Sequence, residues 1–178
     1  MPRLIAALIV FASVASAALG ETPKVALSEA HRSQCRVRVG DTLPDLPLKT
    51  PNGDAQPLAP LLGKRATVVV FYQSAAASKG WMTRTLLADL GPDVADRFGD
   101  QGVATAAISV GGPPTSTTGA GVLSLVDATG GAFAKVGTGR LPRVYVVDPK
   151  GRVLWFDIEY SNSTRRELRQ TLQTFPGE

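Results

Sequence analysis

The strongest nucleophile in this 178-residue chain is a single cysteine, Cys35. It is flanked by Arg32, Arg36 and Arg38, and nearby cationic side chains favour the reactive thiolate form of a cysteine. The only histidine, His31, lies four residues earlier, a spacing that could place both side chains on one helix face. Two ligands without others nearby make a poor metal site. We therefore predict no metal site and keep Cys35 as a possible thiol that is incidental, tethering or reactive.

A second place for thiol chemistry is the corner where a strand predicted at residues 67–72 leads into a helix predicted from residue 78. A helix N-terminus stabilises a thiolate, so a cysteine here would be activated. The corner carries Ser74 and Ser78 but no cysteine. A serine hydroxyl is a weak nucleophile without an adjacent base, and no histidine follows residue 31. The corner therefore has the position for thiol chemistry without the reactive group.

The elements around this corner alternate between strands and helices. The helix at 78–90 is expected to end or kink at Gly91-Pro92, and its apolar residues recur every three or four positions. Ser163 is expected to cap the last helix. The other predicted elements are a hairpin turning at residues 51–54, strands at 103–110 and 122–126, a short helix at 132–136, and a hairpin of strands 144–147 and 153–158. This order predicts an α/β fold with a mixed sheet covered on both faces.

The first twenty residues have the pattern of a secretory signal peptide. Arg3 precedes an apolar run from Leu4 to Val14, and small residues follow it. The run is too short to span a bilayer, so we expect a periplasmic or secreted product without stable membrane insertion after cleavage, although an uncleaved anchor remains an alternative. Residues 21–37 form a polar lead segment, and residues 38–178 form one domain. In an oxidising compartment, a lone cysteine cannot form an intramolecular disulfide.

The charge of the chain does not indicate a nucleic-acid partner. Nineteen Lys and Arg residues against fifteen Asp and Glu residues give a formal net charge of +4. These cations are spread along the sequence, whereas nucleic-acid binding needs a clustered basic face. We therefore expect no nucleic-acid partner.

Four segments, in this order and spacing over roughly residues 38–175, resemble the thioredoxin-like superfamily. The resemblance is to exported thiol–disulfide oxidoreductases and to peroxiredoxins of the alkyl hydroperoxide reductase/thiol-specific antioxidant type. It implies a thioredoxin-like fold with a mixed central sheet, helices on both faces and an N-terminal β-hairpin extension. The segments are Val39–Leu46, Gly63–Tyr72, Gln101–Val103 with Ile108–Val110, and Leu141–Val153.

The catalytic positions are where this sequence departs from those families. The resemblance implies a cis-proline at Pro142, and it places the Cys-X-X-Cys pair at Ala76 and Lys79. A peroxiredoxin alignment places the Pro, Thr and Cys of that family at Gln73, Ala77 and Gly80. Disulfide exchange and peroxide reduction both require a thiolate, and neither alignment contains a cysteine.

The sequence therefore predicts an exported redoxin-like protein that has kept the binding groove and lost the dithiol reaction. The expected groove residues are Trp81, Leu141, Pro142 and Arg143, the expected partner is a protein or peptide segment, and no cofactor is expected. One alternative is an antioxidant or thiol–disulfide oxidoreductase that works through Cys35 or a partner, so enzymatic activity stays open. Another is an assembly partner that uses a different surface, and Trp81 could instead be a packing residue of the helix.

Overall fold

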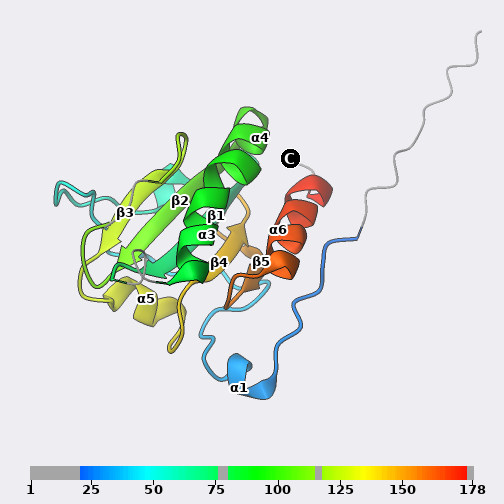
Figure 1. The fold of residues 1–178 in the computed structure, drawn as a ribbon, viewed down its shortest axis with the longest axis horizontal. Coiled ribbons are helices and arrows are strands. Elements are labelled where there is room, and N and C mark those ends of the chain that lie inside the picture. The colour runs from blue at the N-terminus through cyan, green and yellow to red at the C-terminus, as the bar shows by residue number, and fades with distance from the viewer. Residues whose placement is uncertain (1–20, 76–79, 115–117, 176–178) are drawn as a thin grey trace, which may run out of the picture.

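The structure is a computed structural model that describes residues 21–75, 80–114 and 118–175. Five strands form one mixed sheet in the order β3-β2-β1-β4-β5 (Figure 1). β1 is parallel to β2 and antiparallel to β4, and β5 is an edge strand. The strands are β1 (Ala66–Gln73), β2 (Val103–Val110), β3 (Leu123–Asp127), β4 (Arg143–Val147) and β5 (Val153–Asp157).

The sheet separates two apolar cores. On one face, α3 (Trp81–Leu90) and α6 (Asn162–Thr174) pack through leucines such as Leu86 and Leu168 against alternate residues of β1. On the other face, α5 (Gly131–Val136) and the chain before β1 pack through residues such as Phe133 and Leu46. This arrangement confirms the predicted α/β fold with helices on both faces.

At Gly91-Pro92, where a break or kink was expected, the helix continues through one π-helical turn. A π-type turn, η2 (Gly91–Ala95), continues the helix into α4 (Asp96–Phe98) and the short η3 (Gly99–Gln101). Pro92 lacks the N–H that would continue the hydrogen-bond ladder of α3, and the chain widens from α-type to π-type hydrogen bonding where it occurs. The apolar stripe thus continues through Val94 and Phe98 into the core.

The chain before β1 contains the short helices α1 (Glu29–Arg32) and η1 (Ala59–Leu61). The predicted turn at residues 51–54 is present, with the Gly53 N–H donating to the Thr50 carbonyl at 3.0 Å. Its hairpin is a single bridged pair, Lys49 with Ala55, and Lys49 also bridges β3. The lead segment contributes Cys35 and Val37 to the core, so packing begins before residue 38.

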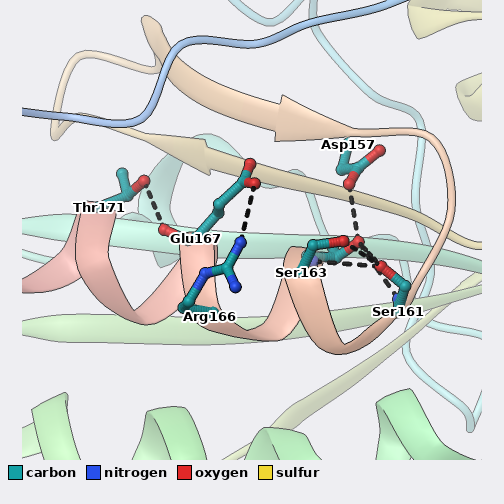
Figure 2. A network of polar contacts seen from close by, with 7 residues as sticks. Asp157, Ser161, Ser163, Arg166, Glu167 and Thr171 are labelled. Carbon is teal, nitrogen blue, oxygen red and sulfur yellow. Dashed lines mark hydrogen bonds and ion pairs between the residues drawn. The ribbon is translucent and has the colours of Figure 1, made fainter.

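The N-terminus of α6 is capped two residues earlier than the sequence predicted. Ser161, not Ser163, is the cap: its Oγ accepts from the Thr164 N–H at 3.3 Å, and the Thr164 Oγ1 accepts from the Ser161 N–H at 3.2 Å. This reciprocal capping box places Ser163 inside the first turn, where its hydroxyl contacts that of Ser161 (Figure 2).

Burial raises the pKa of Asp157, which accepts from the Thr164 hydroxyl at 2.7 Å.

An ion-pair cluster joins α6 to the end of α3 and to η2. The Arg165 Nε donates to the mostly buried Asp93 carboxylate, and its Nη2 lies 3.5 Å from the Asp89 Oδ1. The Tyr160 hydroxyl donates to the other oxygen of Asp89 at 2.8 Å. The hydrogen bond from Arg165 lowers the pKa of Asp93, so this carboxylate is a charged link between the two helical segments.

We predict that Ser161→Ala lowers the free energy of unfolding by about 1 kcal/mol, because an N-cap hydroxyl satisfies a helix N–H that alanine leaves unpaired. Ser163→Ala is the matched control, and its effect should stay within about 0.5 kcal/mol. Urea unfolding of both variants measures the difference. Equal losses would show that Ser161 does not act as the cap.

Candidate functional site

The candidate site is the corner between β1 and α3. β1 ends at Gln73, and Gly80 precedes α3 without a side-chain cap for the helix. Ser74 is buried, and its hydroxyl donates to the Pro113 carbonyl in the loop after β2. Of the three positions where the families carry cysteine, Ala76 and Lys79 lie outside the described residues, and Gly80 is the residue before the helix.

The loop before β4 lies at the same end of the sheet. Phe71 pairs with Arg143, so residues 141 and 142 approach the end of β1. The Leu141–Pro142 peptide bond is cis, as predicted. Leu141 is half-buried and Pro142 is buried, whereas Trp81 at the start of α3 is 63% exposed. The structure thus brings Trp81 and Leu141 to one end of the sheet and leaves the indole accessible.

Arg143 does not line the groove, although the sequence predicted that it would. Its side chain is fully buried and points into the core that contains α5. Its Nε donates to the Arg140 carbonyl at 3.3 Å, its Nη2 donates to the Thr138 carbonyl, and the guanidinium lies 5.3 Å from the centre of the Phe133 ring. In the described part of the chain no carboxylate pairs with it, so carbonyls and an aromatic face compensate its charge.

Cys35 is the fourth neighbour of this guanidinium, at 3.7 Å from Sγ to the Arg143 Nη1. Cys35 is 7% exposed, and its thiol donates to the His31 carbonyl at 3.3 Å. Cys35 belongs to the core on the face of the sheet opposite α3, so the N-terminus of α3 does not act on it. Among the described residues, no three His, Cys, Asp or Glu side chains converge as a metal site would require.

Sequence reasoning missed the contact between Cys35 and Arg143. The two residues are 108 positions apart, so no local pattern connects them. One available signal was the arginine itself, which begins an otherwise apolar strand and must therefore have polar partners when buried. Burial also raises the pKa of Tyr145 on the same strand, and the Arg143 guanidinium partly opposes this increase.

Gly137 makes room for this arrangement. It forms a bridge with Cys35, and a Cβ built on it would lie 2.8 Å from both the Arg143 Cζ and the Gln34 carbonyl. We predict that Gly137→Ala lowers the free energy of unfolding by about 1–3 kcal/mol, through overpacking.

The matched control for this substitution is Gly99→Ala. Gly99 has helical backbone angles and open space where its Cβ would lie, so alanine should stabilise the chain by about 0.4–1 kcal/mol. Thermal and urea unfolding measure both variants. A neutral Gly137→Ala would show that the Arg143 side chain can move aside.

No protein-family model and no curated protein matches this sequence, whereas solved structures do. A candidate protein disulfide isomerase from Bacteroides thetaiotaomicron is similar with a TM-score of 0.69 and 19% identity, over 82% of this chain and 94% of that one. Peroxidoxin BcpB from Mycobacterium tuberculosis is similar with a TM-score of 0.57 and 22% identity, over 79% and 99% of the two chains.

A thiol:disulfide interchange protein from a Bacteroides species is also similar, with a TM-score of 0.53 and 16% identity, over 78% of this chain and 90% of that one. These identities are too low to carry an activity across, but the similarity covers nearly the whole of each neighbour. A chain with one cysteine also cannot form the dithiol pair. The protein therefore has the thioredoxin-like fold, with the strand-to-helix corner of that fold and without its pair of cysteines.

Proposed function

We propose that this protein is an exported, redox-inactive thioredoxin-fold domain that binds a protein or peptide segment at the corner between β1 and α3. The observation that carries the proposal is the 63% exposure of Trp81 at this corner. Tryptophan offers a large apolar surface and one hydrogen-bond donor, and it is enriched among the residues that dominate binding at protein interfaces.

The surroundings of Trp81 support a binding role over a reaction. The chain has one thiol, and it lies on the opposite face of the sheet from α3. Leu141 is half-buried in the loop that reaches the same end of the sheet, and it packs against the core on the face opposite α3. A partner segment could therefore pack against the indole at this end of the sheet without meeting the thiol of Cys35.

Export rests on the leader pattern of residues 1–20, which lie outside the described residues. Within the described part of the chain, no helix has the length and apolar character to cross a membrane. After cleavage of the leader, the expected product would meet its partner in the periplasm or outside the cell.

We predict that Trp81→Ala weakens partner capture by at least about tenfold, because hot-spot tryptophans contribute about 2 kcal/mol or more to binding. The measurement uses the exported protein as bait in its own compartment and then titrates the captured partner. Leu123→Ala, which removes another exposed apolar side chain from β3, is the control and should retain full affinity. Equal capture by Trp81→Ala would overturn the binding site.

A second candidate function is a one-cysteine antioxidant or thiol oxidoreductase. The Arg143 guanidinium, 3.7 Å from the Cys35 sulfur, favours it, because cationic neighbours are typical of reactive cysteines. In that reaction the Cys35 thiol attacks hydrogen peroxide, breaks the O–O bond, becomes a sulfenic acid and releases water. Two thiols from a second protein would then restore Cys35, form a disulfide and release a second water.

Insulin-reduction and peroxide-consumption assays decide between the two functions. The binding proposal predicts no turnover above background, since the thiol is 7% exposed and has no second cysteine to resolve a disulfide. Turnover that disappears in Cys35→Ser would support the thiol function. Turnover that survives this substitution would contradict both.

A further inference from the structure

A cavity of about 910 Å³ lies beside the edge strand β5, away from the corner described above. The extended segment 22–28 and the end of α1 form its outer wall, and Leu154 and Phe156 of β5 form its inner wall. Its volume lies within the range of about 300–1,000 Å³ that is typical of small-molecule sites. The cavity is therefore large enough to hold a ligand.

The walls of this cavity are mainly apolar. Val25 and Leu27 are half-buried, and Val25 packs against the cores on both faces of the sheet, as expected of a side chain at the sheet edge. Val39 also lines the cavity and is 51% exposed. A ligand chain that covered Val39 and the half-buried Leu154 would remove apolar surface from water.

The charged residues that line this cavity are all basic. Lys24, Arg32 and Arg38 line it, and the described residues of the lining include no Asp or Glu. Arg32 uses its Nε and Nη2, each at 3.1 Å, to bind the Leu27 carbonyl, and thus holds the outer wall in place. Among the described residues, the ion-pair partner of Lys24 is the exposed Glu21, and water screens this interaction strongly.

We infer that this cavity binds a single-chain amphiphile with an anionic headgroup. The alkyl chain would lie against Leu154 and Phe156, and the carboxylate or phosphate would meet Arg38 and Lys24. A small ligand fits better than a peptide strand, because segment 22–28 covers one side of the cavity and Gly40 and Asp41 already pair with Val153 on the outer side of β5. This site does not depend on the corner at Trp81.

The experiment titrates the full-length protein calorimetrically with dodecanoate and dodecyl phosphate below their micelle concentrations. Dodecyl maltoside and dodecyltrimethylammonium are the neutral and cationic comparisons with the same alkyl chain. We expect one saturable site that binds the anions about tenfold or more tightly, as a charge-assisted contact predicts. The carboxylate and phosphate arms show which headgroup the site prefers. Equal affinity for all four compounds would overturn the proposal.

Two variants locate the binding in this cavity. Arg38→Ala should weaken binding of the anions about fivefold or more, whereas Arg166→Ala on the exposed face of α6 should not. Arg38 is exposed and contacts Asp41 through its backbone: its N–H donates to the Asp41 carboxylate at 2.8 Å, and its carbonyl accepts from the Asp41 N–H at 3.1 Å. Alanine keeps both bonds, so the substitution should leave the unfolding curve unchanged. Equal weakening by both variants would show that the anions bind through non-specific attraction to the net charge, and would overturn the proposal.

Cys35 provides an independent readout, because it is the only cysteine and it lines the cavity. Dodecanoate should slow its reaction with iodoacetamide, with the same midpoint as the calorimetric titration. Binding that leaves the reaction rate of Cys35 unchanged would place the amphiphile elsewhere and overturn the proposal. Partner capture through Trp81 should stay intact in Arg38→Ala, which separates this result from the proposed function.

Discussion

The pairing of β1 on both of its sides determines where everything else in this protein lies. Its neighbours run in opposite directions, so one end of β1 gathers three connections: the corner into α3, the loop after β2 and the loop before β4. Seven of its eight residues are buried, and one face belongs to each core. A strand buried on both faces cannot slip in register without exposing apolar side chains or burying the wrong ones, so the positions of these three loops follow from the packing of β1. The corner is therefore well placed whether or not it carries a thiol.

That constraint also separates the two places where chemistry could occur. Trp81 begins the helix on one face of the sheet, and Cys35 packs into the core on the other face. Arg143 contacts both places: its backbone pairs with Phe71 near the corner, and its side chain points into the core toward Cys35. A buried guanidinium is costly unless its donors are satisfied. The carbonyls of Arg140 and Thr138 and the Phe133 ring meet this requirement, and they order the turn between α5 and β4.

The strands and long helices could be predicted from the sequence because their signals are local. The β-branched run of β1 and the three-to-four spacing of α3 each fall within one element, and the structure confirms both. The prediction of the α6 cap was wrong because two serines, Ser161 and Ser163, both suit that position. The residue three positions after Ser161, Thr164, completes a capping box and so selects Ser161. The Cys35–Arg143 contact and the cavity beside β5 depend on residues far apart in the chain, and a single sequence carries no local signal for either.

Cys35 connects the two regions for which a function is proposed. Cys35 lines the cavity beside β5, and its sulfur lies 3.7 Å from the Nη1 of Arg143, the residue that follows the loop at the corner. The path from cavity to corner consists of packed or hydrogen-bonded groups: the bridge of Cys35 to Gly137, the bond of Arg143 to Thr138, and the pairing of Arg143 with Phe71. None of these steps needs a second thiol. In this arrangement Cys35, 7% exposed within the core, acts as a small packing residue of the face opposite α3.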